Sequence, residues 1–196
     1  LQAITCAQIN QPPNKDNFFM LKDIQVTGNK DTRSGFGDGI LEAGRKNENV
    51  IALTADLLGS MKLNAFVKEF PERFIQVGIA EQNMASVASG MAAIGKVPFI
   101  ASYAMFSPGR NWEQIRTTVA YNGSNVKVIG AHSGISVGPD GATHQAIEDV
   151  SIMRGIPNMQ VFAPADESDL VTMLPQIWNT PNPAYVRICT RPAKYQ

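Results

Sequence analysis

The chain has 196 residues, of which 44% are hydrophobic and 17% are charged, and this composition suits one globular domain, or two at most. Its 17 Lys and Arg residues balance its 17 Asp and Glu residues, so the net charge of zero gives no reason to expect a nucleic-acid or membrane partner. The two cysteines form no CxxC pair, no apolar run approaches the roughly 18 residues of a membrane helix, and no signal-peptide pattern opens the sequence, so a reduced cytoplasmic setting is the simplest expectation.

Residues 1–30 differ in composition from the rest of the chain. They are rich in Gln, Asn and Pro and show no clear hydrophobic period. We interpret them as an extension, a linker or a cloning-derived segment. The remaining residues, 31–196, are predicted to form one domain.

From residue 31 onward, helical and strand patterns alternate. Asp31 or Thr32 is expected to cap the first helix, and Asp166 is expected to cap the last, which Pro175 should kink or shorten. Helices are predicted at residues 31–46, 63–70, 81–94, 111–121 and 145–153 and after residue 166. Strands are predicted at residues 50–54, 74–77, 97–101, 126–131, 159–162 and 184–188.

This alternation predicts an α/β fold, with a parallel sheet covered by helices on both faces. The strands are continuous apolar runs, which is typical of strands that are buried on both sides. In such sheets, sites form at the carboxyl ends of the strands. Five segments are therefore candidates for the site: residues 54–60, 78–83, 102–110, 132–144 and 189–192.

Glu81 follows a predicted strand and opens a helix made almost wholly of apolar or small residues. We expect such a helix to be buried, which would put its first turn in a cleft or an interface. A carboxyl group that has lost its solvation there is suited to sharing a proton with a ligand nitrogen. Taken alone, however, the position favours a simpler interpretation, in which Glu81 only complements the helix dipole.

Both histidines of the chain, His132 and His144, lie in one glycine-rich segment with Asp140. Histidine exchanges protons near neutral pH, and glycine lets the backbone approach a ligand closely. A surface turn with incidental histidines is one alternative. A zinc site is another, although the spacing matches no compact zinc pattern.

Aromatic residues gather around the end of the third predicted strand. Tyr103 and Phe106 could stack on a flat heterocycle, whereas core packing is the preferred interpretation for Trp112. Because these aromatic residues and the histidine segment are predicted at the same edge of the sheet as Glu81, they favour a functional role for that carboxyl group.

Three segments together resemble the pyrimidine-binding domain of transketolases. They are Gly-Ile-Ala-Glu-Gln-Asn at residues 78–83, Gly-Pro-Asp-Gly-Ala-Thr-His-Gln at residues 138–145, and Pro-Ala-Asp at residues 164–166, and their order and spacing also match. The likeness covers about residues 31–196. The segment 106–112 most resembles the C-terminal subunit of split bacterial or archaeal transketolases.

The resemblance implies thiamine diphosphate as the cofactor. Glu81 matches the glutamate that binds N1′ of the aminopyrimidine ring and favours its 4′-imino tautomer. Phe106 matches an aromatic residue that stacks on this ring, with Tyr103 beside it, and Asp56 matches a residue of the site wall.

The resemblance also implies a phosphorylated sugar as substrate. Asp140 and His144 match residues that contact the sugar hydroxyls, and His144 could assist proton transfer at the carbonyl. A phosphate-binding cluster is matched by Arg33, Ser60, His132 and Arg191. The arginine forks suit phosphate because they bind it through two parallel hydrogen bonds.

One motif resembles a metal-binding sequence of thiamine enzymes but is not expected to bind a metal here. Gly37-Asp38-Gly39 is similar to the Gly-Asp-Gly that opens the diphosphate and metal motif of thiamine enzymes, with Asn64 downstream. That motif stands at the end of a strand, whereas this triplet falls inside the first predicted helix, and Asn64 is followed by Ala65 rather than by a second Asn. We interpret the two glycines as packing positions and assign no metal ligand to this chain.

Two departures from the family limit what is carried over. The segment that begins at Phe106 holds one extra residue relative to long transketolases, so the positions just after Phe106 are not transferred. The sequence also holds no domain for the diphosphate and its Mg²⁺ or Ca²⁺. We therefore expect a partner subunit to supply that domain, within a homodimer or a heterotetramer, and we expect this chain alone to be inactive on its ketose and aldose phosphates.

Three other functions stay open. Deoxyxylulose-phosphate synthase and the β-subunit of 2-oxoacid dehydrogenases share the glutamate and the fold, although the combination of His132, His144 and Asp140 favours a transketolase. A non-catalytic binding or assembly module is a second alternative. A flavodoxin-like nucleotide binder ranks last, because the first strand–helix turn has no glycine-rich phosphate loop.

Overall fold

Six parallel strands form one sheet in the order β2-β1-β3-β4-β6-β5. The computed structural model describes residues 30–190, so residues 1–29 of the predicted extension and Arg191 lie outside the described residues. The strands are β1 (Val50–Thr54), β2 (Phe74–Gln76), β3 (Val97–Tyr103), β4 (Lys127–Ala131), β5 (Gln160–Phe162) and β6 (Ala184–Arg187). All six predicted strands are confirmed, and β3 runs two residues further than expected, which carries it to Tyr103.

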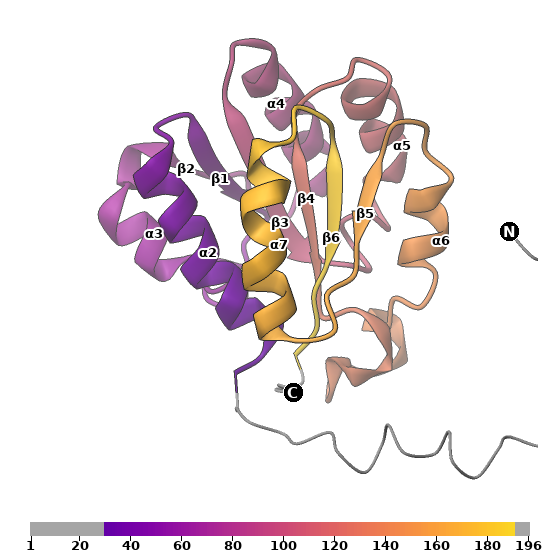
Figure 1. Cartoon of the computed structure of the whole chain (residues 1–196). Coiled ribbons are helices and arrows are strands. Elements are labelled where there is room, and N and C mark those ends of the chain that lie inside the picture. The colour runs from indigo at the N-terminus through magenta and orange to yellow at the C-terminus, as the bar shows by residue number, and fades with distance from the viewer. Residues whose placement is uncertain (1–29, 191–196) are drawn as a thin grey trace, which may run out of the picture.

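Helices cover both faces of the sheet, as predicted (Figure 1). One face carries α2 (Thr32–Lys46), α3 (Asn64–Glu69) and α7 (Glu167–Asn179). The other face carries α4 (Glu81–Ala93), α5 (Trp112–Gln114) with the π-helical η3 (Ile115–Ala120), and α6 (Asp149–Arg154). Within residues 30–190, no helix is both long enough and apolar enough to cross a membrane.

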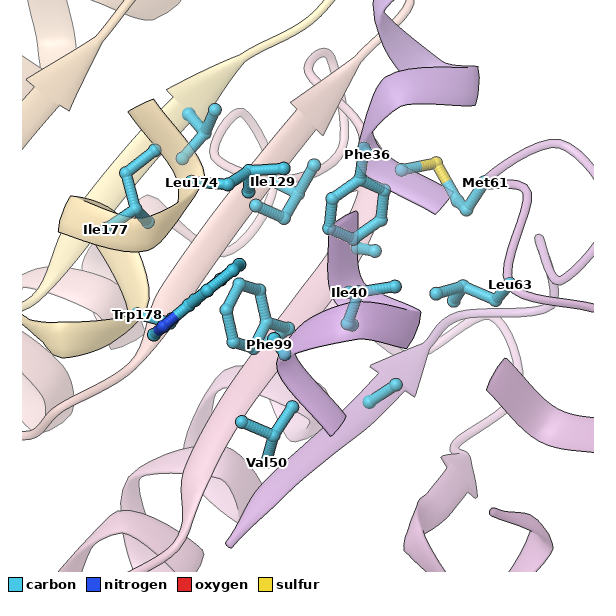
Figure 2. Close-up of a cluster of buried hydrophobic side chains, with 14 of the residues drawn as sticks. Phe36, Ile40, Val50, Met61, Leu63, Phe99, Ile129, Leu174, Ile177 and Trp178 are labelled. Carbon is cyan, nitrogen blue, oxygen red and sulfur yellow. The ribbon is translucent and has the colours of Figure 1, made fainter. Parts of the chain in front are cut away.

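The larger core lies between the sheet and the pair α2 and α7 (Figure 2). Phe36 and Ile40 of α2 meet Leu174 and Trp178 of α7 over Phe99 of β3, and all five side chains are buried. Successive strand residues alternate between the two faces, so each strand contributes to both cores. This two-sided burial explains why the strands are continuous apolar runs.

The Gly-Asp-Gly triplet lies inside α2, as predicted. A Cβ atom at Gly37 would lie 2.6 Å from the carbonyl oxygen of Lys62, and one at Gly39 would lie 2.0 Å from Cδ1 of Leu174. Both glycines therefore allow neighbouring elements to approach α2 closely, which confirms their interpretation as packing positions.

Two predicted helices differ from the structure. The helix predicted at residues 145–153 begins only at Asp149. Three residues earlier, Ala146 pairs with Ser133 in an isolated bridge and accepts a hydrogen bond from Gly134 N at 2.7 Å, so the chain there is not helical. The helix capped by Asp166 is not shortened by Pro175. The carbonyl group that this proline leaves without its helical partner belongs to Val171, which is exposed to solvent.

The helix α4 is buried on one side only. Met84, Ala85 and Ala88 pack against the sheet, whereas Ser86 and Gly90 are exposed. The predicted burial of this helix is therefore found on the face toward the sheet and at Glu81, whereas the opposite face is exposed in the single chain. Small residues carry little apolar surface, so their abundance did not require burial on every side.

Candidate functional site

The carboxyl ends of β1, β3 and β4 and the first turn of α4 meet at one edge of the sheet. In Figure 1 this edge lies at the bottom, where the loop that follows β4 is also found. The prediction that the site segments converge at the strand ends is confirmed for the described residues.

Glu81 is the first residue of α4, and its side chain is only 1% exposed. Arg110 Nη1 donates a hydrogen bond to Glu81 Oε2 at 2.6 Å, so the buried carboxylate has a charged partner. The loop after β3 also holds the helix start, because Asn111 Nδ2 donates to the carbonyl oxygen of Glu81 at 3.1 Å and to Ser107 Oγ at 3.1 Å. A carboxylate in the first turn also complements the helix dipole, so this interpretation and a functional role are compatible.

Aromatic rings line the edge beside this carboxylate. Tyr103, at the end of β3, stacks on Phe106 with ring centroids 6.1 Å apart and planes 12° apart. His144 presents its ring edgewise to both, at 6.2 Å from Tyr103 and 5.3 Å from Phe106. The two aromatic residues and the histidine predicted for the site are therefore in contact with one another.

His132 lies on the other side of Tyr103, stacked on its ring at a centroid distance of 3.7 Å. Its backbone adopts a φ of 53°, in the left-handed region that residues other than glycine rarely occupy. Burial of the imidazole, together with the nearby Arg33 cation, lowers the pKa of His132 from 6.5 to about 4. The ring is therefore neutral at physiological pH.

Arg33 determines which nitrogen of His132 carries the proton. Arg33 Nη1 lies 3.1 Å from His132 Nε2, and a guanidinium group can only donate, so Nε2 accepts and the proton resides on Nδ1. Within the described chain, this Nδ1 is buried without a hydrogen-bond partner. Arg33 also bonds the Asp31 carboxylate through Nε at 2.9 Å, and it makes a long contact of 3.5 Å with the Ser60 carbonyl.

Three other residues predicted for the site, Asp140, Asp56 and Ser60, make fewer side-chain contacts with the residues described above. Asp140 is exposed on the loop before His144, and its carboxylate acts on His132 by raising its pKa slightly against the larger lowering effects. Asp56 is exposed and has a φ of 61°, and its backbone N–H donates a hydrogen bond to Gln76 Oε1 at 2.7 Å. Ser60 contributes its backbone oxygen, rather than its hydroxyl group, to the contact with Arg33.

Sequence reasoning missed two charged residues of the site, Arg110 and Asp31. Arg110 stands in the segment that was singled out for its aromatic residues, but positions after Phe106 were not assigned. Asp31 was expected only to cap α2, which it does by accepting from Ser34 N at 2.8 Å, while it also binds Arg33. Across residues 30–190, no group of three or more His, Cys, Asp or Glu side chains is placed to hold a metal ion.

Residues 29–193 match the family model of the transketolase pyrimidine-binding domain. A protein from Methanocaldococcus jannaschii, assigned as the C-terminal section of a transketolase, is 49% identical over 162 residues, covering 83% of this chain and 51% of the relative. A 6-deoxy-6-sulfo-D-fructose transketolase subunit from Clostridium sp. is 43% identical over 161 residues, covering 82% and 50%. The chain therefore spans about half the length of these relatives.

Solved structures agree with the sequence relatives. The inactive beta4 tetramer of a split-gene transketolase is similar at a TM-score of 0.76 and 41% identity, covering 85% of this chain and 54% of that chain. A transketolase from Campylobacter jejuni is similar at a TM-score of 0.78 and 26% identity, covering 96% and 31%. The chain belongs to the transketolase pyrimidine-binding domain family.

Proposed function

We propose that this chain provides the pyrimidine-binding half of a thiamine-diphosphate site in a transketolase made of two kinds of subunit. The assembled enzyme would transfer a two-carbon ketol unit between phosphorylated sugars. The observation that carries the proposal is the buried Glu81 carboxylate at the start of α4, beside the stacked pair Tyr103 and Phe106.

The site residues fit an aminopyrimidine ring. A planar, positively charged N–H donor, the guanidinium group of Arg110, already bonds Glu81 at 2.6 Å and lies over the Phe106 ring, with Cζ 4.6 Å from its centroid. A flat nitrogen heterocycle with an N–H donor would need the same two contacts: an aromatic face to stack on, which Phe106 offers, and an acceptor, which Glu81 offers.

Once bound, thiamine diphosphate supplies a carbanion centre that can hold the transferred two-carbon unit. Glu81 would share a proton with N1′ of the ring, and its burial keeps water from competing for that hydrogen bond. Phe106 and Tyr103 would keep the ring in plane. These roles follow from the family and stay proposals for this chain.

The substrate side of the site is assigned to the polar residues at the same edge. His144 and Asp140 would contact the sugar hydroxyls, with His144 next to the aromatic pair. Arg33, His132 and Ser60 would bind the phosphate, with Arg191 as a further donor. A phosphate would bind both the Arg33 fork and a neutral histidine, because each can donate an N–H.

A second subunit would hold the diphosphate and its Mg²⁺ or Ca²⁺. This expectation rests on the coverage, since the chain spans about half of relatives that are themselves sections or subunits. The relatives carry different substrates in their names, including 6-deoxy-6-sulfo-D-fructose and apulose 4-phosphate, and a 1-deoxy-D-xylulose-5-phosphate synthase is 43% identical over 152 residues. The family membership therefore supports the cofactor proposal without identifying which sugar phosphate is the substrate.

Reconstitution tests the proposal. The chain and a diphosphate-binding transketolase subunit are assayed alone and mixed, with thiamine diphosphate and Mg²⁺. Ribose 5-phosphate is the acceptor, and either xylulose 5-phosphate or pyruvate is the donor. We expect turnover of the pentose phosphates by the mixture only. Turnover from pyruvate would favour the synthase, and full turnover by the isolated chain would refute the need for a partner.

Glu81→Gln tests the central residue. The amide cannot share the proton with N1′, so we expect kcat of the mixture to fall at least about 100-fold, as expected for a general acid–base contribution. Calorimetry with thiamine diphosphate should still detect assembly-dependent cofactor binding. Cofactor binding in no combination of subunits would instead support a non-catalytic assembly module.

A further inference from the structure

The side chain of Arg110 connects Glu81 to Phe106. Its guanidinium group donates to Glu81 Oε2 at 2.6 Å, and its Cζ lies 4.6 Å from the centroid of the Phe106 ring. These are the acceptor and the stacking face that the proposed function gives to the aminopyrimidine. One planar group therefore makes both contacts that a bound ring would need.

The two partners of this ion pair differ in burial. The Glu81 side chain is 1% exposed, whereas the Arg110 side chain is 44% exposed. Removing a charge partner from a buried carboxylate is strongly unfavourable, so Glu81 needs some donor at all times. Arg110, by contrast, can turn into water without burying its charge, because long basic side chains keep their heads solvated.

The backbone at Arg110 is held by hydrogen bonds that do not involve its side chain. Arg110 N donates to the Phe106 carbonyl oxygen at 3.0 Å, and Gly109 N donates to the Ala104 carbonyl oxygen at 3.1 Å. The next residue, Asn111, is buried and bonded to the start of α4. Movement of the guanidinium group away from Glu81 therefore breaks its two side-chain contacts but requires no change in the backbone.

From this geometry we propose that Arg110 is an internal stand-in for the aminopyrimidine ring, which occupies the ring position in the free subunit and is displaced when the cofactor binds. The proposal rests on the proposed function. It makes Arg110 a positioning residue that keeps the buried Glu81 side chain paired until the ring replaces it. Because the ring exchanges with an existing partner, its own affinity for the free subunit is low, and the diphosphate contacts of the partner subunit must add the rest.

A displacement experiment on the full chain tests the proposal. The probe is 4-amino-2-methylpyrimidine, which carries the ring without the diphosphate, and its affinity is measured by NMR titration. Arg110→Ala removes the competitor, so we expect the probe to bind about tenfold more tightly than to the wild type, the ratio that one lost competing charged contact produces. Glu81→Gln combined with Arg110→Ala should abolish this gain.

Arg116→Ala is the matched control. Arg116 is exposed, and its guanidinium group also lies over an aromatic ring, with Cζ 5.8 Å from the centroid of Trp112, but it does not contact Glu81 in the described structure. Its removal should leave the affinity for the probe unchanged. Equal or weaker probe binding by Arg110→Ala would overturn the proposal and show that Arg110 orients Glu81 permanently.

A second measurement uses the wild-type chain and does not depend on a variant that folds. With ¹⁵N-labelled arginine, addition of the probe should move the Arg110 guanidinium signals toward those of a solvated arginine. Signals that stay unchanged at saturation contradict displacement. If the assembled enzyme binds the cofactor while Arg110 stays in place, only this inference fails; if no cofactor binds at all, the proposed function fails.

Discussion

At the scale of single residues, the site depends on how each charge is compensated. Glu81 is paired with Arg110, and Arg33 is paired with Asp31 while it also donates to His132. The hydrogen bond from Arg33 to His132 Nε2 favours the neutral imidazole, with its proton on Nδ1. A neutral donor suits a phosphate whose charge is matched by an adjacent arginine, and it does not add a further cation to the cluster.

The low pKa of His132 predicts a specific dependence of stability on pH. The folded-state pKa of about 4 lies below the ordinary value of 6.5, so between these values the unfolded chain binds more protons than the folded chain. The free energy of unfolding should therefore fall as the pH drops from 6.5 to 4. Urea unfolding of the wild type and of His132→Gln at pH 7 and pH 4.5 tests this, and we expect the smaller loss in the variant. Equal losses of unfolding free energy in the wild type and in His132→Gln would contradict a lowered pKa of His132 as the cause.

At the scale of the elements, the packing of α2 depends on glycines that let neighbouring segments approach it closely. Gly37 lies against the backbone of Lys62, a residue that itself has a φ of 58°. A flexible side chain could move away from a methyl group added at Gly37, but the Lys62 backbone cannot do so as easily. The glycines of α2 therefore lower its intrinsic helix propensity, and the close packing that they permit compensates for this.

Gly37→Ala should consequently destabilise the chain. The new methyl group would lie 2.6 Å from a carbonyl oxygen, and overpacking of this kind costs about 1–3 kcal/mol of the free energy of unfolding. Gly90→Ala is the matched control on α4, where nothing lies within 4 Å of the added Cβ. There the better helix propensity of alanine should raise stability by up to about 1 kcal/mol. Urea unfolding of both variants measures the difference, and similar effects in the two would refute the packing role.

At the scale of the whole molecule, the described residues place the candidate site at the carboxyl-terminal edge of the sheet, beside exposed apolar surface. Ile79, two residues before Glu81, is 73% exposed, and α4 exposes small residues beside it. Large apolar side chains at the edge of a half-site are expected to be covered when the site is completed. We therefore expect Ile79 to contact the subunit that completes the site.

Ile79→Lys tests this expectation. The side chain is exposed, so the isolated chain should lose less than about 0.5 kcal/mol of stability, whereas its association with the diphosphate-binding subunit should weaken at least about tenfold. Ile94→Lys is the control, because Ile94 is 72% exposed just after the other end of the same helix. Sedimentation of the mixed subunits gives the association constants. Equal weakening by both substitutions would show that the effect is not local to the site.

The sequence alone determined the strands, most helices and the edge at which the site lies. These features depend on residues close together in the chain: apolar runs predict the strands, Asp31 and Asp166 begin helices, and parallel crossovers bring the strand ends to one edge. The positions of Glu81, Tyr103, Phe106 and His144 follow from that topology once their strands and helices are known.

Only the tertiary structure decided how the charges are paired and which face of α4 is covered. Arg110 reaches Glu81 across 29 positions in the sequence, and Arg33 reaches His132 across 99. Such pairs depend on the path of the loops and on small differences in side-chain direction, for which the sequence carries no periodic signal. The sequence also did not predict which face of α4 is exposed, because small residues fit equally well against solvent, a sheet or another subunit.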